Sequence, residues 1–191
     1  MNKTVFISYS WAEPSSGIVN NWLTGCLKGA TIDYSVDKQD CQYHDSIAEF
    51  ERKIGNADMI IAVISRSFLE SIHCMYEMAS VFEKGGDIAR RLFVIGIEEI
   101  QKEDEIRHYW KDEYDEAKYR FETEEFAVEP IEKKYNQTDL IRKHLGKFLV
   151  YLGDRNGMNF SIVSANNYSA VLKQLQNRIN EAEIPVGDLM D

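Results

Sequence analysis

The chain has 191 residues, of which 44% are hydrophobic and 28% charged, which suits one domain with a full-sized core. Its net charge of −10 argues against nucleic acid or an anionic membrane as a partner, because both attract basic protein surfaces. Three cysteines without a CxxC pair, and no apolar run long enough for a signal peptide or a membrane span, favour a cytoplasmic protein with reduced thiols.

The first half of the chain alternates between strand-like and helix-like segments. Strands are predicted for four apolar or β-branched runs: 4–8, 31–36, 59–64 and 91–97. Apolar residues at helical spacing follow the first three runs, and polar residues could cap these helices at their start: Ser15 or Ser16, Asp45 or Ser46, and Ser67 or Ser71. The alternation predicts an α/β fold with a parallel sheet that carries helices on both faces. Ligands of such sheets bind at the carboxyl ends of the strands.

The second half of the chain is less regular. Residues 98–135 are rich in Asp, Glu and aromatic residues, and we expect them to be partly helical and partly solvated. Residues 138–153 are typical of an amphipathic helix, although "KFLVYL" could also form a strand. A fifth strand is predicted at 159–165, with a last helix after it. We therefore expect one domain over 1–191, with a core at 4–97 and 159–182 and an insertion at 98–158.

The stretch "SIHCMYEM" at 71–78 places a His, a Cys and a Glu close together. A metal site is disfavoured, because His73 and Cys74 point about 100° apart on a helix and no second ligand pair exists. A Cys–His nucleophile is disfavoured for the same reason, and Cys74 is better explained as a buried packing residue. Glu77 could be an ordinary solvated residue. Its place near the start of the helix after the third strand, one turn after His73, makes it a candidate for the ligand-binding edge.

Three strings, in this order, resemble a Toll/interleukin-1 receptor (TIR) domain: "VFISYSW" (5–11), "YSVDKQD" (34–40) and "ISRSFLESIHCMYEMA" (64–79). The resemblance implies a flavodoxin-like fold with a five-stranded parallel sheet. Many TIR domains cleave NAD+ at the nicotinamide–ribose bond, and some release ADP-ribose whereas others cyclise it. In those enzymes the glutamate of the third helix is catalytic, which corresponds to Glu77. One ionised carboxylate is chemically sufficient, because nicotinamide leaves without being protonated. If Glu77 lies in the first helical turn, the helix dipole would also favour its charge.

The resemblance further implies a set of substrate-binding residues: Tyr9, Ser10, Trp11, Asp37, Lys38 and His73. This set departs from the family pattern at three places. Some members have Arg at the position of Ser10, the loop that begins at Asp37 lacks the usual Gly, and His73 replaces an aromatic residue that is often Trp. Trp11 can also be explained as a packing residue.

Three hypotheses for the function follow. The first is a bacterial TIR enzyme that consumes NAD+ as its substrate, needs no cofactor or metal, and self-associates through TIR–TIR contacts. Such a chain resembles the signal-producing TIR component of Thoeris-type anti-phage defence, in which the product activates a separate effector. A piece of a larger TIR-containing defence protein is an alternative that stays open. The second hypothesis is a non-catalytic TIR–TIR interaction module. The third is another flavodoxin-like domain, such as a nucleoside deoxyribosyltransferase or a receiver.

Overall fold

The structure is a computed structural model that describes residues 4–29, 33–36, 57–98, 103–124, 129–154 and 158–159, together with 173, 176 and 177. The helix predicted before Gly55 lies outside the described residues, as do most of the strand predicted at 159–165 and most of the helix predicted after it.

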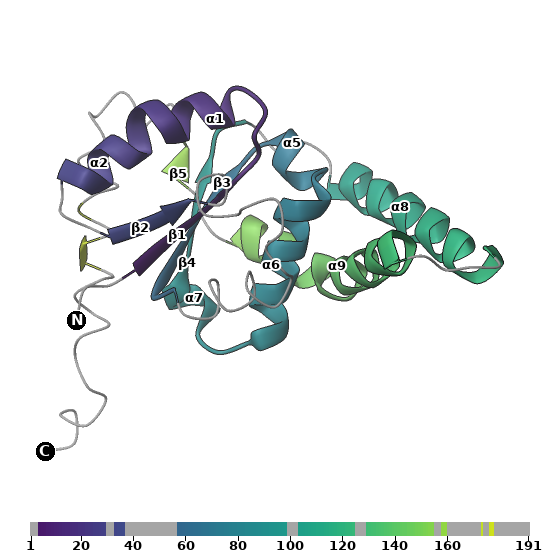
Figure 1. Cartoon of the computed structure of the whole chain (residues 1–191). Coiled ribbons are helices and arrows are strands. Elements are labelled where there is room, and N and C mark those ends of the chain that lie inside the picture. The colour runs from purple at the N-terminus through teal and green to yellow at the C-terminus, as the bar shows by residue number, and fades with distance from the viewer. Residues whose placement is uncertain are drawn as a thin grey trace, which may run out of the picture.

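The centre of the molecule is a parallel sheet, shown in Figure 1. Its strands are β1 (Thr4–Tyr9), β2 (Asp33–Val36), β3 (Met59–Ile64), β4 (Leu92–Gly96) and β5 (Met158–Asn159). They lie in the order β2-β1-β3-β4-β5, and every pair is parallel. This order confirms the predicted α/β, flavodoxin-like fold. The direction of strand addition reverses between β1 and β3, so the switch point where such folds bind ligands lies at the carboxyl ends of these two strands.

Alternate side chains of the strands enter two separate hydrophobic cores. On one face, α1 (Ser15–Ile18), the π-helical turn η1 (Val19–Leu23) and α2 (Thr24–Gly29) run as one continuous helical segment (Figure 1). It packs on side chains from alternate strand positions, which all face this side of the sheet: Val5, Ile7, Tyr9, Met59, Ile61, Val63, Phe93 and Ile95. The opposite face carries Phe6, Ile60, Ala62, Ile64 and Leu92, which pack against α6 (Ile72–Lys84) and two later helices.

The first helical segment does not begin with a serine cap, contrary to our prediction. The residue before α1 is Pro14, which makes no side-chain cap. Instead, the carboxylate of Glu13 accepts the backbone N–H of Gly17 at 3.1 Å and the hydroxyl of Ser16 at 2.5 Å. An anionic acceptor suits this end of a helix, because the first backbone N–H groups have no partner within the helix.

The third predicted helix is two helices, α5 (Arg66–Leu69) and α6. Ser65 caps α5 by accepting the N–H of Phe68 at 3.1 Å, so the cap predicted at Ser67 is wrong. Ser71 caps α6 by accepting the N–H of Cys74 at 3.4 Å, which confirms the alternative start. After Gly85 and Gly86, both with positive φ, the short helix α7 (Ile88–Arg91) precedes β4; the sequence did not predict it.

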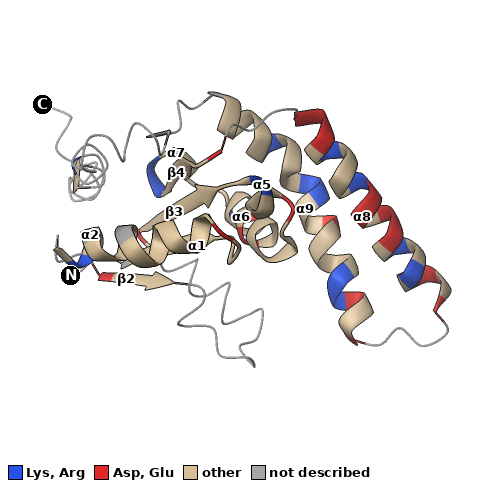
Figure 2. Ribbon diagram, turned by 90° about the horizontal axis from the view of Figure 1, so that it is seen from above, with Lys and Arg blue, Asp and Glu red and all other residues tan. Residues whose placement is uncertain are grey.

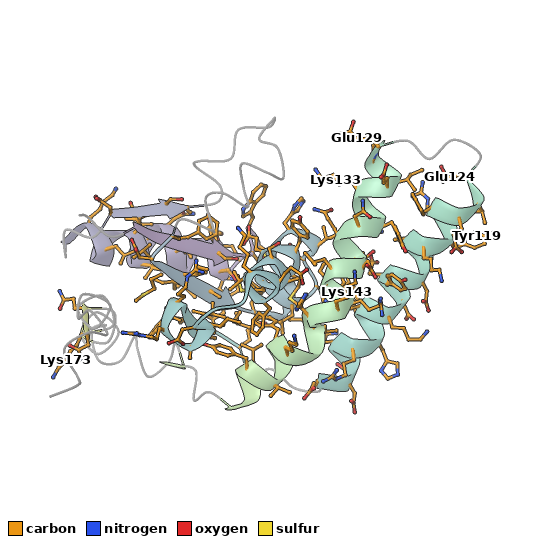
Figure 3. All side chains as sticks on the ribbon, turned by 90° about the horizontal axis from the view of Figure 1, so that it is seen from below. Tyr119, Glu124, Glu129, Lys133, Lys143 and Lys173 are labelled. Atoms are coloured by element: carbon orange, nitrogen blue, oxygen red, sulfur yellow. The ribbon has the colours of Figure 1, made fainter. Side chains whose placement is uncertain are left out.

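The acidic segment forms a helical hairpin of α8 (Glu103–Thr123) and α9 (Glu129–Asp154), which projects beyond the sheet (Figure 1). The described part of this segment is helical with many exposed side chains, which agrees with the predicted partly helical, partly solvated insertion, and "KFLVYL" belongs to a helix. Acidic residues lie along α8 (Figure 2). Tyr119 and Glu129 lie near the far end of the hairpin (Figure 3), where the rings of Phe121 and Tyr135 stack at 4.7 Å. Among the described residues, no helix is long and apolar enough to cross a membrane.

Candidate functional site

Glu77 is a buried carboxylate on the side of α6 that faces the sheet. Its side chain is only 3% exposed, and it accepts a short hydrogen bond from the hydroxyl of Ser8. A hydroxyl that donates to a carboxylate suits the ionised form, which only accepts hydrogen bonds. Glu77 is the sixth residue of α6 and so lies in its second turn, beyond the first turn where the helix dipole acts most strongly. The Ser8 hydroxyl, by contrast, donates directly to this carboxylate.

Ser8 fixes where that carboxylate sits relative to the sheet. It is fully buried near the carboxyl end of β1, and its Cα pairs with that of Ala62 on β3. The contact therefore lies at the switch point between the two central strands. We did not single out Ser8 from the sequence. The available signal was a polar residue inside an otherwise apolar strand, on the same side of the strand as Phe6.

A second group of buried hydroxyls lies where β3 ends and α5 begins. The Ser15 hydroxyl donates to that of Ser65 at 3.1 Å, and the hydroxyls of Ser65 and Ser67 are 2.9 Å apart. Because Ser65 also caps α5, this group ties the start of α1 to the turn that leads into α5. These side chains are hydrogen-bond partners for one another, as buried polar groups require. They hold together the helix starts on the two faces of the sheet.

The structure places the other predicted site residues in different surroundings. Tyr9 is buried in the core on the face opposite to Glu77. Ser10 is buried just after β1, where its hydroxyl accepts the N–H of Ala12 at 3.3 Å. Trp11 is 57% exposed, so the interpretation of Trp11 as a packing residue is wrong. His73 is exposed in the first turn of α6.

Asp37 and Lys38 lie outside the described residues. Ser8 and Glu77 are polar side chains from different elements that the fold brings into direct contact at this edge. Trp11 and His73 are the predicted site residues whose side chains are open to solvent in the described part of the chain.

The remaining reactive group of "SIHCMYEM" belongs to the core. Cys74 is reduced and buried among the apolar residues of α6, which confirms the packing interpretation. No group of three or more His, Cys, Asp or Glu side chains within the described ranges could hold a metal ion.

Comparisons with known proteins agree with the fold. A family model of the TIR domain matches residues 5–126, which is well over half of the chain and extends through α8. Among solved structures, the TIR domains of the activated Roq1 resistosome, which directly recognises the pathogen effector XopQ, match with a TM-score of 0.50 and 15% identity. The match covers 93% of this chain and 99% of the other chain, and at that identity it supports the fold alone. No curated protein sequence matches significantly. The match to the family model, over a sheet of flavodoxin-like order, shows that this chain belongs to the TIR domain family.

Proposed function

We propose that this TIR domain is an NAD+ nucleosidase in which Glu77 is the catalytic residue. The observation that carries the proposal is the position of the Glu77 carboxylate, held by Ser8 at the switch point of the sheet. A buried carboxylate is costly unless it is hydrogen-bonded, and such groups gather at functional sites. The proposal therefore gives a reason for an acidic side chain that a purely structural core would not need.

The reaction asks little of the protein beyond one negative charge. Cleavage breaks the bond between the ribose C1′ and the nicotinamide nitrogen, and the bonding electrons leave with nicotinamide, which becomes neutral. No general acid is needed, unlike in ordinary glycoside hydrolysis. The positive charge that develops on the ribose is stabilised by the fixed Glu77 carboxylate, and this interaction is stronger in the transition state than in the ground state. Water, or a nucleophile within the same molecule, then completes the reaction.

We also propose a wider role, which the resemblance to bacterial TIR enzymes suggests. The product is ADP-ribose, or a cyclic or conjugated form of it, that signals to a separate effector in bacterial anti-phage immunity. The chain self-associates through TIR–TIR contacts, and NAD+ is consumed as a substrate. We assign substrate contacts to Ser10, to the exposed Trp11 and His73, and to the loop that begins at Asp37 and Lys38. Tyr9 supports this edge from the opposite face of the sheet.

One observation favours the alternative, a TIR domain that assembles but does not catalyse. Glu77 is 3% exposed and bonded to Ser8, so its carboxylate could serve only to attach α6 to β1. A purely structural carboxylate would contribute to stability, whereas a catalytic one would also be required for turnover. Measuring both properties on the same variant separates the two functions.

The test is release of nicotinamide from NAD+, followed by chromatography, at high protein concentration and with a crowding agent that promotes association. Glu77→Gln keeps the shape of the side chain and removes its charge. We expect wild type to release nicotinamide and Glu77→Gln to be at least 100-fold slower, the size of effect seen when a transition-state interaction is lost. Equal rates for the two proteins, or no release by assembled wild type, would overturn the proposal and favour the interaction module. The mass and mobility of the product distinguish hydrolysis from cyclisation.

A further inference from the structure

The helical hairpin contacts the protein body at the point where α6 begins. Helix α5 ends at Leu69, and Ser71 caps α6 only two residues later. The indole N–H of Trp110 on α8 donates to the carbonyl oxygen of Leu69 at 2.7 Å. The hydroxyl of its neighbour Tyr109 donates to the carbonyl oxygen of Glu70 at 3.0 Å. Carbonyl groups at the end of a helix lack partners within the helix, and here the hairpin supplies them.

These two donors are held rigidly. Trp110 is buried in the same core cluster as Phe68, Leu69 and Met75, and its ring meets that of Tyr109 edge to face at 5.3 Å. Burial, with the negative charges of nearby carboxylates, raises the pKa of the Tyr109 phenol above its ordinary value of 10.0. The hydroxyl therefore stays protonated and able to donate at any physiological pH.

The other end of α6 is also fixed by the hairpin. The ring of Phe82 packs edge-on against Phe148 and Tyr151 of α9, with ring centroids 5.8 and 5.9 Å apart. His144 of α9 contacts Glu83 at the same end of α6. Helix α6 thus lies between the sheet and the hairpin (Figure 1), which bonds to the residues just before α6 and packs against its last turn.

We propose that Tyr109 and Trp110 are positioning residues, which set the location of Glu77 by fixing the start of α6. From Ser71 to Glu77 is six residues, or about 9 Å along a helix that moves as one body. Displacement of the helix start therefore moves the carboxylate relative to the sheet. Misplacement of a catalytic group by about 1 Å can cost about 100-fold in rate. The catalytic part of this inference rests on the proposed function; the structural part does not.

The chain contains a matched control for these contacts. The hydroxyl of Tyr151 on α9 donates to the carbonyl oxygen of Leu92 at 2.7 Å, so it also links the hairpin to the body through an aromatic side chain. Leu92 is the first residue of β4 and thus lies at the amino end of the sheet, away from the carboxyl edge. Tyr109→Phe and Tyr151→Phe each remove one such hydroxyl and keep the ring, and Trp110→Phe removes the indole N–H.

The first measurement is amide hydrogen exchange across residues 69–77, which does not depend on catalysis. Loss of one neutral hydrogen bond allows about fivefold faster exchange where the bond restrained local opening. We expect this acceleration in Tyr109→Phe, and at least as much in Trp110→Phe, but not in Tyr151→Phe. Equal exchange rates in this segment for Tyr109→Phe and Tyr151→Phe would overturn the proposal. Wild-type exchange rates in both Tyr109→Phe and Trp110→Phe would also overturn it.

The second measurement is the kinetics of nicotinamide release. We expect kcat to fall roughly 10-fold in Tyr109→Phe and Trp110→Phe, with KM within about twofold of wild type. A displaced carboxylate stabilises the transition state less well, whereas substrate binding is little changed. Tyr151→Phe keeps the wild-type kcat. Faster exchange with unchanged kcat would overturn the positioning role. If wild type itself released no nicotinamide, the proposed function would fail, and the exchange experiment would still decide whether the hairpin holds the start of α6.

Discussion

Removal of the Ser8 hydroxyl should show how much the Glu77 carboxylate depends on it. Ser8→Ala deletes one oxygen atom at a fully buried position and leaves Glu77 without this donor. A hydrogen bond to a charged group contributes about 1.5–3 kcal/mol to stability, compared with about 1 kcal/mol for a neutral pair. In a domain of this size, 1 kcal/mol shifts the melting temperature by about 2–4 °C. We therefore expect Ser8→Ala to lower Tm by roughly 3–12 °C.

The control for this substitution is Ser15→Ala. Ser15 is as fully buried as Ser8, but its hydroxyl donates to another hydroxyl, that of Ser65. Its loss should therefore lower Tm by only about 2–4 °C. Differential scanning calorimetry of both variants gives the comparison. In a Glu77→Gln background the partner of Ser8 is neutral, so the cost of Ser8→Ala should fall to about 1 kcal/mol.

The kinetic consequence is measured in the same variants. If Ser8 orients the carboxylate that stabilises the transition state, Ser8→Ala should lower kcat about 10- to 100-fold, the rate equivalent of a charged hydrogen bond. Ser15→Ala should leave kcat within about twofold of wild type, because its hydroxyl bonds to that of Ser65. A Tm loss in Ser8→Ala no larger than in Ser15→Ala, and independent of the charge at position 77, would refute the reasoning.

Two further predictions concern the helices. Burial alone would raise the pKa of Asp139, but hydrogen bonds from Lys143 and Arg142 outweigh it and hold the pKa below its ordinary 3.8. Asp139→Asn should therefore lower Tm at neutral pH. The difference in Tm from wild type should disappear as the pH falls below 3.8 and then below the lowered pKa of Asp139 in the folded protein. A difference in Tm that persisted in acid would contradict this. In α1, a Cβ at Gly17 would lie 2.7 Å from a Glu13 carboxylate oxygen. Gly17→Ala should thus not raise Tm, whereas in a Glu13→Ala background it should stabilise by about 1 kcal/mol, measured by urea denaturation; a gain in both backgrounds would show that Glu13 does not matter.

The sequence predicted the central strands closely. β3 begins and ends where the apolar run at 59–64 does, because a strand buried on both faces must be apolar at every position. The alternation of strands and helices likewise predicted the parallel sheet. The sequence did not predict which side chain caps a helix where several candidates lie close together. Several hydroxyls lie at the starts of α1 and α5, and only the folded backbone decides that Glu13 and Ser65 supply the acceptors.

The hairpin shows a different limit. Its long helices have a polar surface, so the apolar pattern along α8 is weak, and buried residues are few: Ile106, Trp110 and Ala117. The acidic composition therefore predicted a partly helical, partly solvated segment, without the hairpin. What makes the helix stable is packing against α9, together with the contacts of Trp110 with the body. Such contacts join residues about 40 positions apart in the chain, which local periodicity does not report.

By itself, the sequence determined the fold class, the family resemblance and the candidacy of Glu77, because these depend on local patterns and on the order of motifs. Only the tertiary structure decided that Glu77 is buried, that Ser8 is its partner, and that Tyr9 faces the opposite core. The physical reason is that strand residues alternate between two faces, and the reversal of strand order between β1 and β3 decides which helix covers each face. A serine 69 positions away in the sequence thereby becomes the neighbour of the glutamate.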